Sequence, residues 1–258
     1  MRRFKSIIFD IDGVIWIDGA PAPGALELLD YLYHRDVPFC LLTNGCNIST
    51  DERHQELAEA GFRLREDQVV TASDVTQDWL LTNGVGSIMY LGSPNAGKDL
   101  ARSVTIKATY PVDAVVVGDL FDFYSRDILQ EAAKAIDSGA TFIAMQNNKQ
   151  WWDGRKWSID NGFWVAGLEF VTGRQAVITG KPSLHAYSVA LQRVDKTGIC
   201  SLDTIFVSDD INIDLKGANG AGLGTVYIGP PQELPSWIDA DFSDLATLRQ
   251  MMVGVLDE

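Results

Sequence analysis

The stretch Ser6–Gly13, SIIFDIDG, decides the fold of this 258-residue chain. Its first half is short, apolar and β-branched and ends at acids and a glycine, a pattern that predicts a buried parallel strand. In an extended or turning segment, Asp10 and Asp12 can converge on one point, and Gly13 lets a ligand approach the backbone closely. Alone, the pattern is equally typical of a turn with solvated acids. A calcium loop beginning at Asp10 is excluded, because Pro21 stands where such a loop needs glutamate.

Strands and helices are expected to alternate along the rest of the chain. Apolar periodicity predicts strands at residues 37–42, 87–91, 114–117, 141–145, 204–207 and 225–228, helices at residues 24–35, 49–61, 73–81, 126–138 and 186–194, and a final helix from residue 234 onward. The Asp18-Gly19 pair predicts a hairpin turn. The alternation predicts an α/β fold with a doubly wound, Rossmann-like parallel sheet, in which ligands bind beyond the carboxyl ends of the strands.

The pattern starts afresh near residue 85, which predicts two domains. We expect a core domain of residues 1–82 and 179–258, made from both ends of the chain. A smaller domain of residues 83–178 is then inserted into it.

The chain is acidic, with a formal net charge of −14. An acidic surface repels nucleic acid and anionic membranes, so neither is an expected partner. It also repels phosphorylated metabolites. A phosphate site in this chain therefore has to concentrate positive charge locally, through a metal ion, a lysine or a set of backbone N–H groups.

Cysteine and histidine usage argues against a disulfide framework and a zinc site. The three cysteines form no CxxC pair, and the three histidines show no ligand spacing. Cys46 is expected to be an inert small hydrophobe. The apolar run at the N-terminus is too short for a signal peptide, and no later segment approaches a membrane span. We therefore expect a soluble, cytoplasmic protein.

Two further motifs suit an anion. Thr43 and Asn44 follow a predicted strand and offer a hydroxyl, an amide and backbone N–H groups, although alone such a pair is more often a helix cap. Lys181 precedes a helix whose start is fixed by Pro182, and helix starts attract anions. A lone lysine is otherwise normally a surface residue.

The last motif is a group of acids just beyond the predicted strand at residues 204–207. Asp209, Asp210 and Asp214 would repel one another there, and a divalent cation is the simplest remedy. Solvated loop acids are the alternative interpretation. Together, the four motifs are much more specific than any one of them.

In this order, Asp-x-Asp-Gly, strand-Thr-Asn, Gly-Lys-Pro and (Gly/Ser)-Asp-x-x-x-x-Asp, the motifs resemble the four-part signature of haloacid dehalogenase-type hydrolases. The inserted domain resembles the type II, subclass A, cap of the NagD-like phosphatases. Residues 151–154, 173–176 and 208–214 are similar to the phospholysine/phosphohistidine/inorganic pyrophosphate phosphatase branch. Ser208 stands where the family usually has glycine, which is expected to alter the loop geometry slightly.

The resemblance implies a phosphatase mechanism. Asp10 would attack phosphorus and form an aspartyl-phosphate, while Asp12 would protonate the leaving alkoxide and then accept a proton from the hydrolytic water. Thr43 and Asn44 would orient the phosphoryl group. Lys181 would neutralise both the nucleophile and the phosphate. A dehalogenase is a weak alternative, because chloride leaves without an acid.

The resemblance also implies Mg²⁺ as cofactor. The ion would be held by the Asp10 carboxylate, the Asp12 backbone carbonyl and Asp209, with waters completing the shell. Asp214 is included in this metal site, more as a support than as a direct ligand. Asp210 could take the place of either acid.

The cap is expected to contact the leaving group of a small phosphorylated metabolite. Lys149 and Trp151 lie in the best candidate loop, a polar and aromatic run in which Trp could stack on a base or sugar. The alternative is that the tryptophans fill the cap's own core. Caps of this type imply, by resemblance, a homodimer as well. The physiological substrate stays open.

Three rival functions remain. A phosphotransferase or mutase would use the same aspartyl-phosphate. A non-catalytic, receiver-like phospho-signalling domain also combines Asp, Thr and Lys on a doubly wound sheet, but without a long insertion in its core. A dinucleotide-binding module is less favoured, because the glycine-rich residues 217–224 lead into a strand and lack the G-x-G-x-x-G spacing.

Overall fold

The computed structural model describes residues 4–120, 123–152, 155–195, 198 and 200–256. The chain forms two compact units. The first unit contains Met1–Thr43, Arg53–Val70 and Tyr187–Glu258, and the second contains Asn44–Glu52 and Thr71–Ala186.

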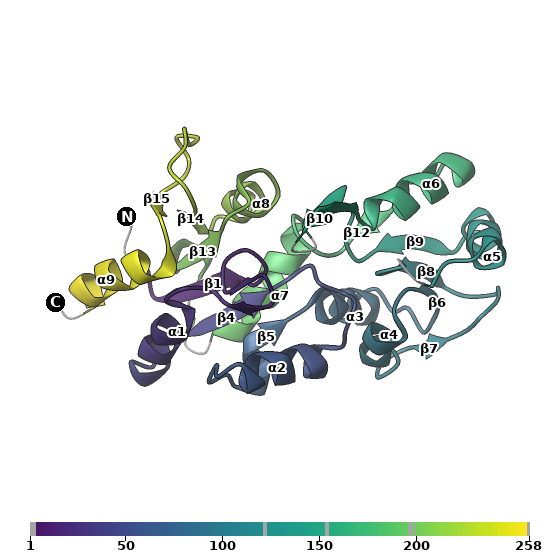
Figure 1. Cartoon of the computed structure of the whole chain (residues 1–258). Coiled ribbons are helices and arrows are strands. Elements are labelled where there is room, and N and C mark those ends of the chain that lie inside the picture. The colour runs from purple at the N-terminus through teal and green to yellow at the C-terminus, as the bar shows by residue number, and fades with distance from the viewer. Residues whose placement is uncertain (1–3, 121–122, 153–154, 196–197, 199, 257–258) are drawn as a thin grey trace. The chain divides into compact units, whose positions relative to one another are not determined.

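The first unit is built on a six-stranded parallel sheet (Figure 1). In spatial order its strands are β15 (Ala240–Phe242), β14 (Gly224–Ile228), β13 (Thr204–Ser208), β1 (Ser6–Asp10), β4 (Phe39–Leu42) and β5 (Val69–Val70). The chain passes from β1 to β4 and β5 on one side, and later adds β13, β14 and β15 on the other. The sheet is therefore doubly wound, as predicted.

Helices cover both faces of this sheet. They are α1 (Ala25–His34), α2 (Thr50–Glu59), α7 (Leu184–Val194), α8 (Lys216–Gly220) and α9 (Leu245–Leu256). The first three residues of α2 and of α7 belong to the second unit. Short 3₁₀ turns at Glu66–Gln68 and Ser201–Asp203 and a π-helical turn at Ile211–Leu215 complete the unit.

Alternation along β1 explains why the sheet is covered twice. Ile7 and Phe9 are fully buried in the cluster that contains the apolar residues of α1 and α9. Neighbouring side chains on a strand point to opposite faces. On the other face, α7 covers the sheet: the Cys40 thiol donates to the Ala190 carbonyl oxygen at 3.5 Å.

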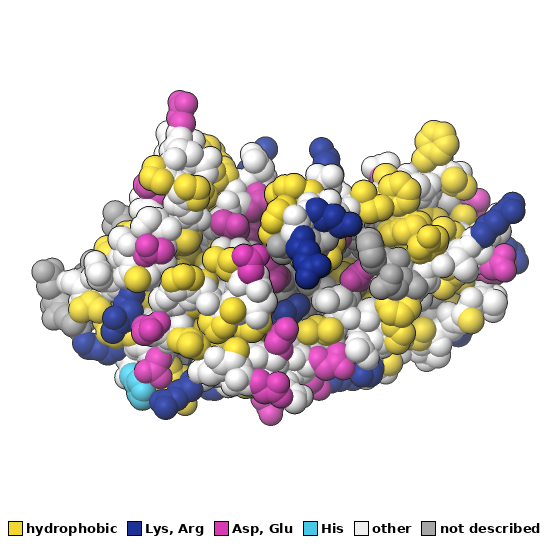
Figure 2. Space-filling view, viewed as in Figure 1, with side chains coloured by type: hydrophobic (Ala, Val, Ile, Leu, Met, Phe, Trp, Pro, Cys, Tyr) yellow, Lys and Arg dark blue, Asp and Glu magenta, His cyan; other side chains and the backbone are white. Residues whose placement is uncertain are grey.

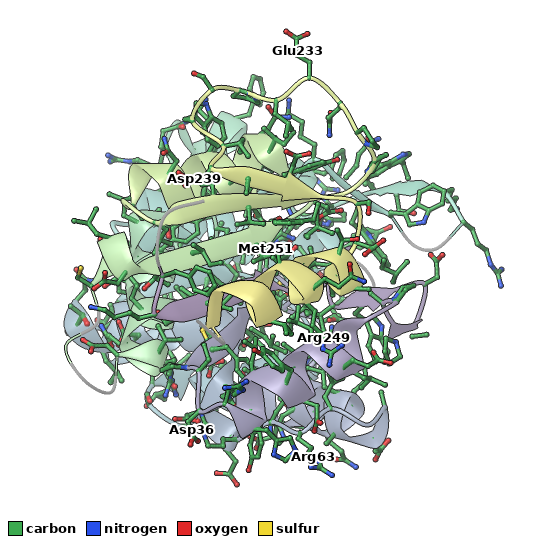
Figure 3. All side chains as sticks on the ribbon, turned by 90° about the vertical axis from the view of Figure 1, so that its left-hand side faces the viewer. Asp36, Arg63, Glu233, Asp239, Arg249 and Met251 are labelled. Carbon is green, nitrogen blue, oxygen red and sulfur yellow. The ribbon has the colours of Figure 1, made fainter. Side chains whose placement is uncertain are left out.

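Helices α1 and α9 pack side by side against the first of these faces (Figure 3). The guanidinium groups of Arg35 and Arg249 each lie over the ring of Tyr31, at 5.6 and 5.7 Å from its centroid. The Arg249 contact joins α9 to α1 and stabilises their pairing modestly, whereas the Arg35 contact lies at the C-terminal end of α1 itself.

The Asp18-Gly19 turn is confirmed. β2 (Trp16–Ile17) and β3 (Ala20–Pro21) pair in antiparallel fashion around it. Asp18 and Gly19 both have positive φ, 50° and 81°, as a two-residue hairpin turn of this kind requires.

The second unit has its own five-stranded parallel sheet. In spatial order its strands are β12 (Val177–Ile178), β9 (Thr141–Ala144), β8 (Ala114–Val117), β6 (Ser87–Leu91) and β7 (Thr105–Ile106). A separate hairpin pairs β10 (Gln150–Trp152) with β11 (Trp157–Ile159). The helices are α3 (Ala72–Thr82), α4 (Pro94–Leu100), α5 (Arg126–Asp137) and α6 (Gly162–Thr172).

The boundaries of the compact units differ from those of the expected domains. Helix α3 and residues 179–186, which we expected in the core domain, lie in the second unit. Hydrogen bonding within that unit accounts for this. The Thr76 and Thr179 hydroxyls are 2.6 Å apart in a buried pair, and the Thr179 N–H donates to the Ala144 carbonyl oxygen at the end of β9.

Most predicted elements are present within one or two residues, but some elements were missed. Helix α6 is apolar at almost every position, so it shows no helical period. The final helix was predicted to start too early: residues 240–242 first add β15 to the sheet, and α9 begins at Leu245. The glycine-rich residues 217–224 form a helix end and a turn before β14, as expected.

None of the helices in the described residues is both long and apolar enough to cross a membrane. All three cysteines have free thiols, and Cys40 and Cys46 are buried.

A matched pair of leucines tests the packing of the first unit. Leu28 of α1 is fully buried, whereas Leu202 is 65% exposed. Leu28→Ala should lower the free energy of unfolding by about 2–5 kcal/mol, because it leaves a cavity in the core. Leu202→Ala should change it by less than about 0.5 kcal/mol. Urea denaturation followed by circular dichroism measures both; equal costs would contradict the assigned core.

Candidate active site

The candidate site of the first unit lies at the carboxyl end of β1. β1 lies between β13 and β4. The order of the strands reverses between β1 and β13, because the strands after β1 are added first on the β4 side and later on the β13 side. Phe9 is level with Val207, and Asp10 with Leu42. The ends of the three strands therefore coincide, at the kind of switch point where ligands bind in doubly wound sheets. Asp10 itself is buried there.

Asp209 approaches the backbone that follows Asp10. A Cβ placed on Gly13 would be 2.4 Å from Asp209 Oδ2, closer than real atoms allow. Gly13 also has a φ of +89°, which a side chain would strain. Glycine is thus required for the carboxylate to reach this place. The structure brings residues 10 and 209 to one strand edge, as the sequence predicted.

Thr43 and Asp12 meet at the same edge. The buried Thr43 hydroxyl, just beyond β4, donates to Asp12 Oδ2 at 3.1 Å. The Asp12 side chain is exposed, so water and a leaving group can reach its carboxylate. This hydrogen bond fixes the orientation of a group that is well placed to exchange protons.

Ser208 has a role that the sequence analysis missed. Its hydroxyl donates to Asp214 Oδ2 at 2.9 Å and accepts from the Asp210 N–H at 3.1 Å. Asp214 is buried, and its main-chain oxygen accepts from the Tyr187 hydroxyl. The only signal in the sequence was the serine in place of the family's usual glycine.

The three acids after β13 differ in their hydrogen-bond partners, which separates a candidate metal ligand from structural acids. Asp210 Oδ1 accepts from the N–H groups of Asn212 and Ile213, both at 2.8 Å, and so caps the π-helical turn. Asp214 is bound by Ser208, which favours a supporting role over direct metal ligation. Asp209 is left as the acid of this loop that lies against the backbone at Gly13.

Magnesium fits the donors at this edge. Mg²⁺ needs only one or two carboxylates, because it keeps several waters. The Asp10 and Asp209 carboxylates and the Asp12 carbonyl are such a set, and the cradle at Gly13 admits the Asp209 carboxylate. Among the described residues, no three Asp, Glu, His or Cys side chains form a metal cluster by themselves.

Asn44 and Lys181 belong to the second unit, where they bind each other. The Lys181 N–H donates to Asn44 Oδ1 at 2.8 Å, and Asn44 Nδ2 donates to the Lys181 carbonyl oxygen at 2.9 Å. Lys181 is buried, not a surface lysine. It lies just beyond Thr179 and Gly180, which follow β12 at the carboxyl end of that unit's sheet.

Lys149 and Trp151 lie at the hairpin of the second unit, after β9. Lys149 is exposed, and Trp151 and Trp152 are each about half exposed. The alternative that these tryptophans fill the cap's core is therefore wrong. Cys46 is buried, and burial raises the pKa of its thiol well above the usual range, which keeps it protonated and inert as expected.

Asp160, near the same hairpin, was not predicted from the sequence. Its Oδ1 accepts from Gln146 Nε2 at 2.7 Å and from the Asn161 N–H at 2.6 Å. Burial raises the pKa of the Asp160 carboxyl group, and these hydrogen bonds oppose the rise. Asp160 lies in none of the four motifs, so no sequence pattern indicated it.

Comparison with known proteins agrees with this geometry. Residues 7–105 match the family model of the haloacid dehalogenase-like hydrolases, and residues 178–231 match a second model described as HAD-hydrolase-like. The chain is 29% identical over 225 residues to the ribonucleotide monophosphatase NagD of Escherichia coli K12, covering 87% of both proteins.

Solved structures agree as well. NagD from E. coli K-12 superposes with a TM-score of 0.85 at 27% identity, covering 95% of this chain and 98% of NagD. A glycerol phosphate phosphatase from Mycobacterium tuberculosis, in complex with magnesium, superposes with a TM-score of 0.83 at 25% identity, covering 96% of this chain and 77% of that one. The chain therefore belongs to the haloacid dehalogenase-like hydrolases and, over most of its length, is similar to NagD-like phosphatases.

Proposed function

We propose that this enzyme is a Mg²⁺-dependent phosphatase that hydrolyses small phosphorylated metabolites through an aspartyl-phosphate. The observation that carries the proposal is the convergence of Asp10, Asp12, Thr43 and Asp209 at the switch point of the first sheet. Membership of a hydrolase family leaves the receiver-like signalling domain without support.

The first half-reaction transfers the phosphoryl group to the protein. A carboxylate oxygen of Asp10 attacks phosphorus, and the bond from phosphorus to the leaving oxygen breaks. Asp12, held by Thr43, gives its proton to that oxygen, so the product leaves as an alcohol. Thr43 also orients the phosphoryl oxygens, and Lys181 supplies positive charge to them.

The second half-reaction restores the enzyme. Water attacks phosphorus while Asp12 takes one of its protons, and the bond to Asp10 breaks to release inorganic phosphate. Asp10, Asp209 and the Asp12 carbonyl would hold Mg²⁺, which would supply charge stabilisation for the transferring group when bound. Asp214, bound by Ser208, supports the loop that carries Asp209.

The proposed substrates are phosphate monoesters of metabolites. The names of relatives, ribonucleotide monophosphatase, acid sugar phosphatase and glycerol phosphate phosphatase, support this class and span nucleotides, sugars and polyols. The phospholysine/phosphohistidine/inorganic pyrophosphate branch stays a prediction, and so does a cytoplasmic location.

The nucleophile and the metal are tested together. Asp10→Asn keeps the size of the side chain but removes the attacking charge, so phosphate release should fall by more than about 1,000-fold. EDTA should abolish wild-type activity and Mg²⁺ should restore it. Asp18→Asn, the same substitution in the exposed hairpin turn, is the control and should be fully active.

Release of inorganic phosphate is compared with release of the alcohol product over a panel of nucleotides, sugar phosphates and glycerol phosphate. Pyrophosphate, which yields two phosphates and no alcohol, is assayed by phosphate release alone. Equal amounts of phosphate and alcohol indicate hydrolysis. Less phosphate than alcohol, with a new phosphoester that accounts for the difference, would indicate phosphotransferase activity. Activity that survives both EDTA and Asp10→Asn would overturn the mechanism.

We propose that Lys149 and Trp151 contact the leaving group. Alanine at either position should raise KM by about 3- to 10-fold for substrates with a base or sugar, because stacking or charge contacts are lost. Trp157→Ala is the control: Trp157 pairs with Trp152 across the hairpin and so points to the face opposite Trp151. Unchanged kcat and KM for both variants across the panel would remove this role.

We also propose that the enzyme forms a homodimer through the second unit. Hydrophobic side chains gather over α6 (Figure 2), where Phe163 and Val171 are exposed and Phe170 is 90% exposed. The acid of this helix, Glu169, is engaged by the Ala176 N–H at 3.0 Å. β12 is an edge strand of the sheet. An edge strand can pair with the same strand of a second copy, and a two-fold axis would then also bring the two apolar α6 surfaces into one interface.

Light scattering on the purified enzyme tests the dimer. The wild type should have twice the mass of one chain, and Phe170→Glu should reduce it to a monomer, because a charge cannot be buried there without a partner. Leu202→Glu, an equal change at an exposed leucine of the first unit, should leave the mass unchanged. A monomeric wild type would refute the proposal.

A further inference from the structure

Asn44 uses both polar ends of its side-chain amide on the main chain of one residue, Lys181. Its Oδ1 accepts the Lys181 N–H at 2.8 Å, and its Nδ2 donates to the Lys181 carbonyl oxygen at 2.9 Å. Two hydrogen bonds to the groups on either side of one Cα fix the rotation of that residue about its backbone. The direction in which the Lys181 side chain leaves the backbone is therefore set by Asn44.

The segment around Lys181 is built to accept this contact. The Gly180 N–H donates to the Met145 carbonyl oxygen at 2.9 Å. A Cβ on Gly180 would be 2.3 Å from that oxygen and 2.6 Å from Asn44 Oδ1. Glycine is thus the only residue that lets both partners approach. The Ser183 hydroxyl donates to the Thr179 carbonyl oxygen and closes the turn from the other side.

We propose that Asn44 is a positioning residue that acts through Lys181 rather than a ligand of the phosphoryl group. The inference rests on the proposed function, in which Lys181 supplies positive charge to the transferring phosphate. An ammonium group stabilises a transition state only where it has been placed in advance. A displacement of about 1 Å at such a group can cost about 100-fold in rate.

The decisive variant is Asn44→Asp. Ionised, the new side chain still accepts the Lys181 N–H, but its second oxygen faces the Lys181 carbonyl oxygen and repels it. We expect kcat at neutral pH to fall by about 10- to 100-fold, with KM changed by less than about threefold. A lost phosphate ligand would instead raise KM.

The same variant carries its own rescue. A protonated carboxyl group has a C=O acceptor and an O–H donor, as the amide has, so both hydrogen bonds return. The ratio of variant to wild-type kcat should therefore rise as pH falls toward the titration of the introduced carboxyl group. That group titrates at about 3.9 in model peptides and higher where its charge is repelled.

The matched control is Asn83→Asp. Asn83 lies in the same unit, at the end of α3, and its Nδ2 donates to the Trp79 carbonyl oxygen at 2.8 Å. The substitution removes the same kind of donor at an exposed site. It should leave kcat, KM and the pH profile at their wild-type values.

Asn44→Ser extends the test without a new charge. Its hydroxyl is too short to hold both main-chain groups of Lys181, so kcat should again fall, with no rescue at low pH. Circular dichroism establishes that each variant is folded. If Asn44→Asp does not fold, the split between kcat and KM in Asn44→Ser decides.

Lys181→Ala separates this inference from the proposed function. If that variant keeps wild-type activity, Lys181 has no catalytic role and the proposed mechanism fails. If it is inactive while Asn44→Asp and Asn44→Ser keep wild-type kcat, only the positioning role is overturned. A rise in KM alone at position 44 also overturns it, because it assigns Asn44 to phosphate binding.

Discussion

Parallel pairing of β1 with its two neighbours is the constraint on which the site depends. The backbone hydrogen bonds hold Phe9 level with Val207 and Asp10 level with Leu42, so three strands end together. Acids about 200 residues apart in the chain meet there because the ladder leaves them no other place. The acids proposed to bind the metal thus need no mutual attraction, which like charges could not provide.

The second unit also places polar side chains at the carboxyl ends of parallel strands, but these side chains differ in type. Its parallel sheet also ends in polar side chains, Lys181 after β12 and Gln146 after β9. Here the strand ends carry a lysine and amides, with Asp160 beside them, rather than the nucleophile. In this acidic chain, Lys181 is buried, and its main-chain N–H and carbonyl groups both form hydrogen bonds with Asn44.

Much of the fold followed from local patterns, because buried strands and capped helices carry strong signals. Asp10, Thr43 and Asp209 were predictable, since each stands directly after an apolar strand. The extent of the second unit was not, because no local pattern encodes the hydrogen bond from Thr179 to Ala144 of β9, or the contact between Thr76 and Thr179 that brings α3 into the same unit. Helix α6 lacked a period, and the partner of the Asn44 amide was invisible until residues 137 positions apart were seen in contact.

The serine that precedes Asp209 links two positions of the chain. One hydroxyl satisfies both a buried carboxylate at position 214 and a main-chain amide at position 210. A glycine there would leave that acid without this donor, while an apolar residue at 214 would leave the hydroxyl without its acceptor. Relatives that carry glycine at the first position must therefore supply a hydrogen-bond donor to the second acid from another part of the chain.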